Sequence, residues 1–364
     1  MALDRRTKEL APAGVEIISF AMGDPRERTP DFIRSIARES IPEISSYPTV
    51  SGLPELRAAC AGWVQRRFGV SLDPATQILP CNGTKEAVAH LAFAAIRPGE
   101  RDTVVIPSPA YPVYEGAARM AGAQVHVTPL HAEDHWRFRP ERVPEKVWER
   151  TAVLWLNDPH NPTGSLLDSG ARGAIAAHAR PHGYWIAADE AYADLWFDRV
   201  AGSMLEHGLE NVIAFHTLSK RSAMTGYRSG FMAGDPRMIE ALRQQRPTLG
   251  VATPEFVQRA AIAAWSDDAH AEAMRQVYAA KRDLMLAAFA RQGWRVEASE
   301  ATFFLWMAAP ARDDRGFVDE LLRRGVTAMP GSLLGPGGEG YVRWALVPTL
   351  EQCRAGLERL ESMR

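Results

Sequence analysis

The sequence has few cysteines and no long apolar run. Its three cysteines, Cys60, Cys81 and Cys353, are odd in number and widely spaced, and none belongs to a C-x-x-C pair. This spacing excludes a disulfide framework and a cysteine-based zinc cluster, and it favours a reducing compartment. The first residues contain no apolar signal core, and no stretch approaches the length of a membrane span. We therefore expect a cytoplasmic protein with no membrane contact.

An excess of charge of one sign is also lacking. The chain has 42 Lys and Arg residues against 44 Asp and Glu residues, which gives a formal net charge of −2. No basic block indicates a nucleic-acid surface, so we expect no nucleic-acid partner. His131 and His135 flank two acids, but their spacing is not that of the zinc-binding H-E-x-x-H helix. We interpret this segment as a solvated loop and predict no metal site.

The chain is long enough for more than one domain. It has 364 residues, of which 46% are hydrophobic. Short apolar runs alternate with helical patterns through the middle of the sequence, which predicts an α/β fold with a mostly parallel sheet and helices on both faces. The expected strands cover residues 103–107, 124–128, 152–156, 184–188, 212–216 and 230–234. The expected helices between them include 85–96, 113–121 and 170–182.

The pattern changes after about residue 266. We expect a long helix that is capped by Asp267 or Asp268 and ends at Gly293. Shorter strand and helix patterns follow, and the capping box of Thr349 and Gln352 opens the last helix. These elements predict a smaller α+β domain that the long helix joins to the first domain.

Polar residues follow several expected strands at their carboxyl ends, where open parallel sheets bind ligands. Lys220 comes after two hydroxyl residues that end the strand pattern, and Arg228 lies eight residues further on. The amine could form an imine with an aldehyde cofactor, while the hydroxyls and the guanidinium could hold a phosphate. Taken alone, a lysine in such a position is usually only solvated.

Asp189 follows the neighbouring expected strand. A partly buried carboxylate needs a cationic partner, and a protonated pyridine nitrogen would serve. Tyr192, three residues further on, could hydrogen-bond a phenolic oxygen. The alternative is that Asp189 caps a helix and that Tyr192 only packs.

Three more strand ends have both a functional and a structural interpretation. Asn161 lies in an Asn-Pro-Thr-Gly turn, and its amide could reach a cofactor oxygen, with a cis bond before Pro162. Gly83 and Thr84 open a helix, where free amides and the helix dipole could bind an anion, or Thr84 could be a plain N-cap. Tyr111 could lie against a flat aromatic ring or only pack in its loop.

The order of these motifs resembles the fold-type-I pyridoxal-phosphate enzymes, and specifically the class I/II aminotransferases. The resemblance runs from about Phe20 to Thr349, nearly the whole chain. The matching segments are Gly83-Thr84-Lys85, Ala110-Tyr111-Pro112-Val113-Tyr114, Asn161-Pro162-Thr163-Gly164, Asp189-Glu190-Ala191-Tyr192 and Ser219-Lys220 with Arg228. The resemblance implies a transaminase that uses pyridoxal 5'-phosphate, with amino-acid and 2-oxo-acid substrates.

The resemblance also implies a role for each matched residue. Lys220 resembles the catalytic Schiff-base lysine, and Asp189 resembles the acid that pairs with the pyridinium nitrogen. Tyr192 and Asn161 are similar to the pair on the cofactor's ring oxygen, and Tyr111 is similar to the residue that stacks on the ring. The residues that resemble the phosphate site are Thr84, Lys85 (through its backbone amide), Thr217 and Arg228.

Three further residues resemble positions that bind the substrate or the neighbouring subunit. Arg343 is similar to the arginine that clamps a substrate α-carboxylate, and Gly23 and Asn161 resemble residues beside that carboxylate. Tyr47 resembles the tyrosine that reaches the phosphate of the neighbouring subunit, which implies a homodimer with shared active sites. The expected division is an arm with part of the small domain at 1–40, a large cofactor-binding domain at 41–267 and a small domain at 268–364.

Within this family the sequence is most similar to the succinyldiaminopimelate aminotransferases of lysine biosynthesis. The segments that carry this likeness are 216–222, 226–231, 263–270 and 299–306. The likeness implies glutamate as donor and N-succinyl-2-amino-6-oxopimelate as acceptor. Because this acceptor has several carboxylates, we predict additional cationic contacts, with Arg26, Arg28 and Arg221 as candidates.

Two other enzyme functions remain open at this point. The first is a class I aminotransferase that acts on aspartate, alanine or aromatic amino acids. The second is a pyridoxal-phosphate lyase that cleaves C–S bonds, because the same lysine serves both reactions. A regulator would need an attached DNA-binding domain, and the residues before about position 20 leave no room for one.

Overall fold

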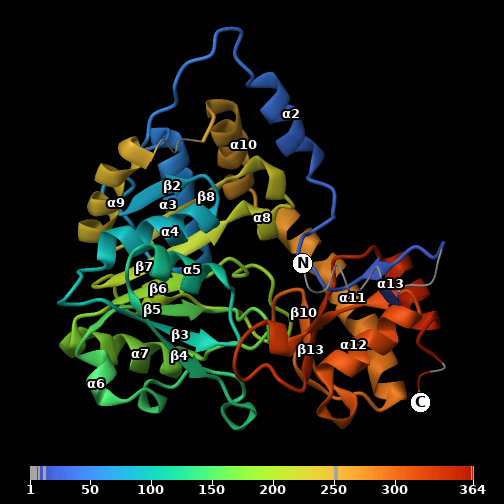
Figure 1. Ribbon diagram of the computed structural model, residues 1–364. Helices are drawn as coiled ribbons and strands as arrows, with labels where there is room; N and C mark the ends of the chain where they lie inside the picture. The colour runs from blue at the N-terminus through green and yellow to red at the C-terminus, as the bar shows by residue number, and fades with distance from the viewer. Residues whose placement is uncertain (1–5, 7–8, 11–13, 250–252, 362, 364) are drawn as a thin grey trace.

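The computed structural model describes residues 6, 9–10, 14–249, 253–361 and 363. Two sheets form the centres of two parts of the molecule, and the long helix α11 (Ala269–Gln292) runs between these parts (Figure 1). The larger sheet has seven strands and the smaller one has four. This arrangement confirms the predicted α/β fold with an additional α+β unit.

The strands of the large sheet are mostly parallel. In order across the sheet they are β2 (Ile78–Cys81), β8 (Gly230–Gly234), β7 (Val212–Thr217), β6 (Trp185–Asp189), β5 (Thr151–Asn157), β3 (Thr103–Ser108) and β4 (Gln124–Pro129). Strand β8 is antiparallel to both of its neighbours, and the other adjacent pairs are parallel. All six predicted strands are therefore present, and β2 is an additional edge strand.

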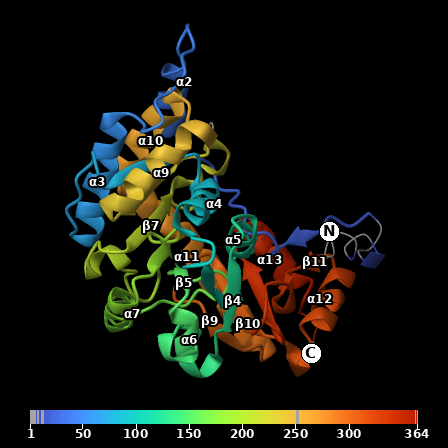
Figure 2. The same cartoon turned by 60° about the vertical axis from the view of Figure 1, so that its left-hand side comes forward.

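Helices cover both faces of this sheet because successive side chains of a buried strand point to opposite sides. In β7, Ile213 and Phe215 pack on one face, whereas Val212 and Ala214 pack on the other. The first face is covered by α4 (Thr84–Ala95), α5 (Val113–Met120) and α9 (Pro236–Leu249). The second face is covered by α3 (Pro54–Phe68), α6 (Glu145–Trp148), α7 (Ser169–His182) and α10 (Glu255–Ser266) (Figure 2).

The smaller sheet is antiparallel and belongs to the C-terminal part of the chain. Its strand order is β12 (Met329–Pro330), β13 (Tyr341–Ala345), β10 (Phe304–Ala308) and β9 (Val296–Ala298). Its core includes residues of α11, α12 (Asp314–Arg323) and α13 (Leu350–Glu358). The predicted capping box at Thr349 and Gln352 opens α13, with both reciprocal hydrogen bonds formed.

The N-terminal arm contacts both parts of the molecule. Its strand β1 (Ile18–Ser19) pairs in parallel with β11 (Val326–Thr327), next to the small sheet. The following helix α2 (Asp31–Glu39) packs against α10 on the large part, and the segment after it projects at the top of Figure 1. This path agrees with an arm that is shared between the parts, and the boundaries at residues 40 and 267 stay our proposal.

Two expectations from composition can be compared with the structure. All three cysteines are buried and free in the structure. Within the described part of the chain, no helix is both long and apolar enough to cross a membrane.

Candidate active site

A cavity of about 690 Å³ lies beside the carboxyl ends of the large-sheet strands. The N-terminal arm and strands β10 and β13 of the small part complete its wall. The predicted site residues that line it are Gly23, Thr84, Lys85, Tyr111, Asn161, Asp189, Tyr192, Thr217, Lys220, Arg228 and Arg343. The structure therefore brings together all the predicted site residues except Tyr47.

Lys220 lies just beyond β7, in the short helix α8 (Leu218–Arg221) rather than at the strand end. Thr217 ends β7, and its hydroxyl accepts a hydrogen bond from the Ser219 amide, which turns the chain into α8. The Lys220 amine donates a hydrogen bond of 2.9 Å to the carbonyl oxygen of Gly23 in the arm.

The surroundings of Lys220 favour a neutral amine. Burial is the largest influence and lowers the pKa of Lys220 to about 8. The carboxylate of Asp24 opposes this shift, whereas the positive charges of Arg343 and Arg228 add to it. An amine with this pKa can accept and release a proton near neutral pH.

Asp189 ends strand β6, where it is buried in the floor of the cavity. Its Oδ2 accepts a hydrogen bond of 2.5 Å from the Tyr114 hydroxyl, and its Oδ1 accepts one from the Ala191 amide. A turn follows Asp189, so the interpretation as a helix cap is wrong. Burial raises the pKa of Asp189, while Tyr114, the Ala191 amide and the charge of Lys220 oppose this shift.

The Asp189 carboxylate also lacks a basic partner. Among the described residues, no Lys, Arg or His nitrogen lies within ion-pair distance of it, and its hydrogen-bond donors are neutral. A buried carboxylate without a cation is costly, and a pyridinium nitrogen would remove that cost.

The first turn of α4 and Arg228 together form an anion site. Gly83 occupies the N-cap position of this twelve-residue helix with φ 84°, so the alternative of Thr84 as N-cap is wrong. A Cβ atom on Gly83 would lie 2.2 Å from Nη2 of Arg228, and only glycine allows both this approach and the positive φ. The guanidinium therefore lies directly beside the free amides of the helix N-terminus, where a phosphate binds well.

Arg343 extends from β13 into the opposite wall of the cavity and is buried. Its Nη2 donates to the Ala21 carbonyl (2.6 Å), its Nη1 donates to Oδ1 of Asn161 (3.1 Å), and its Nε has no partner. Burial lowers the pKa of Arg343 to about 10. No acidic side chain in the described part of the chain pairs with it, so its charge is free for a ligand carboxylate.

Two further residues of the site, Tyr114 and Asn157, were assigned no role from the sequence. Tyr114 holds Asp189, and it lies one helical turn after Tyr111 in a motif that the sequence already singles out. Asn157 ends β5 beside Asp189 in the sheet register. Its side chain accepts from the Asn161 amide (2.7 Å) and donates to the Asp189 carbonyl (2.7 Å), so it fixes the turn that carries Asn161. The predicted cis bond before Pro162 is present in this turn.

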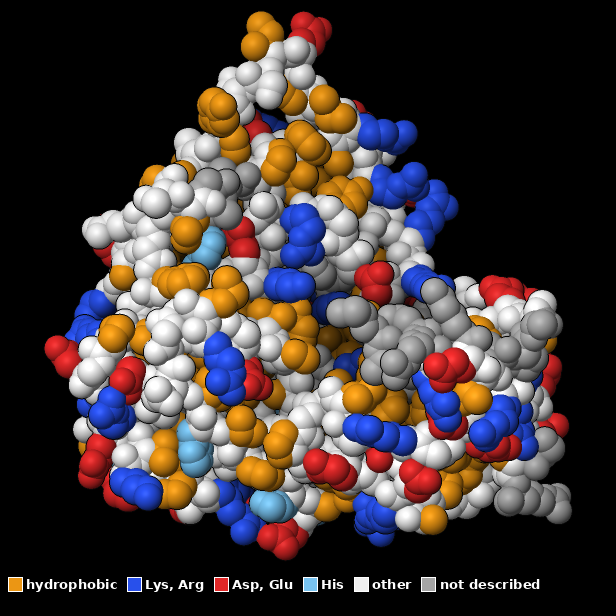
Figure 3. All heavy atoms as spheres, in the orientation of Figure 1, with side chains coloured by type: hydrophobic (Ala, Val, Ile, Leu, Met, Phe, Trp, Pro, Cys, Tyr) orange, Lys and Arg blue, Asp and Glu red, His pale blue; other side chains and the backbone are white. Residues whose placement is uncertain are grey.

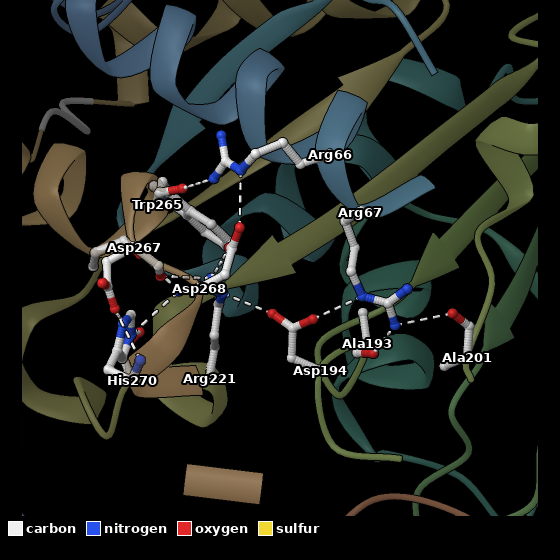
Figure 4. Close-up of polar contacts among 12 residues, drawn as sticks. Arg66, Arg67, Ala193, Asp194, Ala201, Arg221, Trp265, Asp267, Asp268 and His270 are labelled. Atoms are coloured by element: carbon white, nitrogen blue, oxygen red, sulfur yellow. Dashed lines mark hydrogen bonds and ion pairs between the residues drawn. The ribbon is translucent and has the colours of Figure 1, made fainter. Parts of the chain in front are cut away.

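The arginines predicted to bind additional carboxylates do not line the cavity. Arg221 is buried outside it and donates to Asp194 and Asp268, at 2.7 Å each (Figure 4). The prediction that Arg221 contacts substrate is therefore wrong, because its guanidinium is already paired with two acids. Arg28 is exposed and pairs with Asp31, and Arg26 is exposed as well.

Comparison with known proteins identifies the class of protein. The chain matches the family "Aminotransferase class I and II" over residues 15–360, and it belongs to this family. It has the fold-type-I architecture of this family and is a transaminase that depends on pyridoxal phosphate.

Particular relatives share nearly the whole chain. It is 36% identical to the LL-diaminopimelate aminotransferase of Dehalococcoides mccartyi, over 98% of this chain and 94% of that protein. It is 38% identical to the 4-dedimethylamino-4-oxo-anhydrotetracycline transaminase of Streptomyces rimosus, over 94% of this chain and 93% of that protein. A solved structure of a probable N-succinyldiaminopimelate aminotransferase from Thermus thermophilus superimposes with a TM-score of 0.91 at 31% identity, covering 99% of this chain and 98% of that one.

Proposed function

We propose that this transaminase exchanges an amino group between glutamate and a substrate of the diaminopimelate type, in diaminopimelate and lysine biosynthesis. The observation that carries the proposal is the buried guanidinium of Arg343, which faces the Lys220 cavity and pairs with no acidic side chain of the described ranges. The names of the relatives support the carbon skeleton of the substrate. They leave open whether its distal amine is free or succinylated, so both forms belong in the test.

We propose the following roles for the residues around the reacting carbon. Arg343 binds the α-carboxylate with two parallel hydrogen bonds, beside Gly23 and Asn161. The Nζ of Lys220 would take the proton from the substrate Cα and deliver it to the aldehyde carbon of the cofactor, for which a pKa of about 8 is suitable. When bound, pyridoxal phosphate supplies the electron sink for the pair that this proton leaves behind.

The remaining residues of the cavity fit the cofactor itself. Asp189 would hold the pyridine nitrogen in its protonated form, because the buried carboxylate forms no ion pair with a cationic side chain in the described part of the chain. We assign Tyr192 and Asn161 to the ring oxygen and Tyr111 to the face of the ring. The proposed phosphate ligands are Thr84, the Lys85 amide, Thr217 and Arg228, which lie around the N-terminus of α4.

The side chain of Lys85 fits a second, distal carboxylate. Lys85 is exposed on the cavity wall, and its amine has no partner among the described residues. It can supply the additional cationic contact that the sequence had assigned to Arg26, Arg28 or Arg221. Asp24 lines the same cavity and would suit a free distal ammonium group better than a succinyl carboxylate.

A survey of half-reactions tests this function. Loaded enzyme is mixed with single amino acids, and the change in cofactor absorbance is followed. We expect two kinds of substrate to react: glutamate, and either LL-diaminopimelate or its N-succinyl form. Each should react at least about 10-fold more efficiently than alanine or phenylalanine, which is the effect expected of one additional charged hydrogen bond. Lys220→Ala should react with none of them. A preference for alanine or aromatic amino acids would contradict the proposal.

A Lys85 variant separates the distal carboxylate from the rest of the site. Lys85→Met should raise KM for glutamate about 10-fold, the lower end for a lost charge-assisted hydrogen bond. Alanine has no distal carboxylate, so its KM should not change. An equal rise in KM for both amino acids would show that Lys85 acts through the cofactor instead.

The alternative function, C–S bond cleavage, has a different product pattern. Pyruvate and ammonia formed without a 2-oxo acid would indicate the C–S lyase.

We further propose a homodimer with shared active sites in the cytoplasm. The segment between α2 and α3 projects from the molecule and exposes the large apolar side chains Ile41, Ile44 and Tyr47. Hydrophobic side chains are visible at the tip of this projection (Figure 3). Such a run of exposed apolar groups suits contact with a second chain.

A further inference from the structure

Helix α7 carries two histidines on one face, at the edge of the large sheet opposite to the active site. His178 and His182 are four residues apart, so they are neighbours on the helix surface. Their rings stack at a centroid distance of 4.2 Å. His182 precedes the start of β6, whereas Asp189 lies at the other end of that strand. The pair therefore has no part in the aminotransferase chemistry.

The carboxylate of Glu145 faces this pair from α6, which lies beside α7 in both ribbon views (Figures 1 and 2). One ring nitrogen of each histidine and one oxygen of Glu145 all lie within 4.8 Å of one another. The distance from Nε2 of His182 to Oε1 of Glu145 is 2.9 Å. Trp148, also on α6, packs edge-on against His178 and limits the movement of its ring.

The hydrogen bonds of the two rings engage both Nδ1 atoms and leave the two Nε2 atoms as the available ligands. Nδ1 of His182 lies 2.8 Å from the His178 carbonyl, which can only accept, so this Nδ1 carries the hydrogen. In the neutral ring, Nε2 then has a lone pair that faces the carboxylate. Two acceptors at 2.9 Å repel unless a proton or a metal ion lies between them. Nδ1 of His178 is occupied by the Tyr184 hydroxyl, which leaves its own Nε2 available.

We propose that Glu145, His178 and His182 form a binding site for one divalent transition-metal ion of the Zn²⁺ type. Two imidazole nitrogens and a carboxylate oxygen are a common donor set for Zn²⁺, with water completing the coordination. The His178 carbonyl and the Tyr184 hydroxyl orient the two rings, as outer partners do in known sites. The ion would fasten α6 to the C-terminal end of α7. Because only the folded chain presents these ligands together, binding stabilises the fold.

Calorimetric titration of the tag-free, cofactor-loaded enzyme with ZnCl₂ in excess Mg²⁺ tests the site. We expect one saturable Zn²⁺ per chain and a rise in Tm, with no change in cofactor absorbance. His182→Ala should weaken binding at least about 10-fold, and Glu145→Gln, which keeps both rings, should weaken it as well. His131→Ala is the matched control, since His131 is exposed on a loop and should not affect binding.

Transaminase activity and cofactor absorbance show that each variant is folded. X-ray absorption of the zinc-loaded enzyme provides a second measurement, and it should detect two imidazole ligands. Equal zinc binding by the wild type and His182→Ala would overturn the proposal. A zinc spectrum without imidazole ligands would overturn it too, even if the affinity were high.

Discussion

At the scale of the residue, the cavity holds two buried groups, one of which must be neutral and the other charged in the proposed function. Lys220 must become neutral to accept a proton, and burial with the two nearby arginines lowers its pKa. Asp189 must stay ionised to hold a pyridinium nitrogen, yet burial raises its pKa. The short hydrogen bond from Tyr114 favours the ionised carboxylate, so this tyrosine would support the charge that the proposed role of Asp189 requires.

Replacing Tyr114 by phenylalanine should therefore impair turnover. Tyr114→Phe removes one hydrogen bond to a charged group, which is worth about 1.5 kcal/mol or more, and we expect kcat to fall about 10-fold. Steady-state kinetics at saturating cofactor measure this effect. Tyr278→Phe is the control, because the buried Tyr278 hydroxyl has no hydrogen-bond partner among the residues that the structure describes, and its loss should leave kcat unchanged. Equal values for Tyr114→Phe and the wild type would refute the role.

The places of single residues in the cavity were predictable where a motif fixes them along the chain. Asp189 and Lys220 lie at or just after strand ends of the large sheet, which brings them to one cavity, and Arg343 reaches the same cavity from β13 of the small sheet. The contact of Tyr114 with Asp189 was not predictable, because it depends on how α5 packs against a strand whose last residue is 75 positions further along the chain. Arg221 was misassigned because adjacent residues of a helical turn point about 100° apart, so sequence proximity to Lys220 does not place it in the cavity.

At the scale of the element, a buried ion network joins α8 to the junction between α10 and α11. Arg221 donates to Asp194, to the Ala264 carbonyl and to Asp268 (Figure 4). Burial alone would raise the pKa of Asp194, but Arg221 and Arg67 outweigh it and hold this pKa below its usual range. The network therefore connects the turn that contains Lys220 with the start of the long helix α11.

Loss of Arg221 should be costly because it leaves buried acceptors unpaired. We expect Arg221→Met to lower the free energy of unfolding by about 3–5 kcal/mol, the range for breaking one side of a buried ion pair. Denaturant titration of the holoenzyme measures the change. Arg66→Met is the matched control. Arg66 also bonds Asp268 but is half exposed, so its loss should cost roughly 0–1 kcal/mol. Similar losses in both variants would argue against a special role for Arg221.

The elements themselves were largely predictable. Five of the six predicted strands are buried along nearly their whole length, and the resulting apolar runs make them visible in sequence, whereas the sixth, β4, is a less buried edge strand. Strand β2 was missed because it has only four residues, with Pro80 among them, and proline is tolerated there because β2 lies at the sheet edge. The short strands β1, β11 and β12 have two residues each, too few for any period to be recognised.

At the scale of the whole molecule, the arm connects the two parts across the cavity. Carbonyl groups of Ala21 and Gly23 accept hydrogen bonds from Arg343 and Lys220, which come from different sheets. Beyond this crossing, the arm runs to the exposed segment that contains Tyr47. Within one chain Tyr47 does not reach the cavity, so its predicted phosphate contact requires a second chain.

Mixing two defective variants tests whether Tyr47 serves the neighbouring chain. Lys220→Ala and Tyr47→Ala proteins are mixed under conditions that allow subunit exchange, at a cofactor concentration that leaves Tyr47→Ala mostly unloaded. In a mixed dimer with a shared site, the cavity that retains Lys220 receives the intact Tyr47 from its partner. After random exchange in an equal mixture, about half of the dimers are mixed, and each mixed dimer has one intact site out of two. About a quarter of wild-type activity should therefore return.

The matching control pairs Lys220→Ala with Arg343→Ala. Both residues line the cavity of one chain, so each mixed dimer has one defect in each cavity and no activity should return. If the Tyr47→Ala mixture also stays inactive although subunits exchange, Tyr47 does not complete the partner's site. The exposed segment would then need a different explanation, because an apolar run of this kind is costly to leave in water. Recovery in the Tyr47 mixture alone would establish that two chains build each active site.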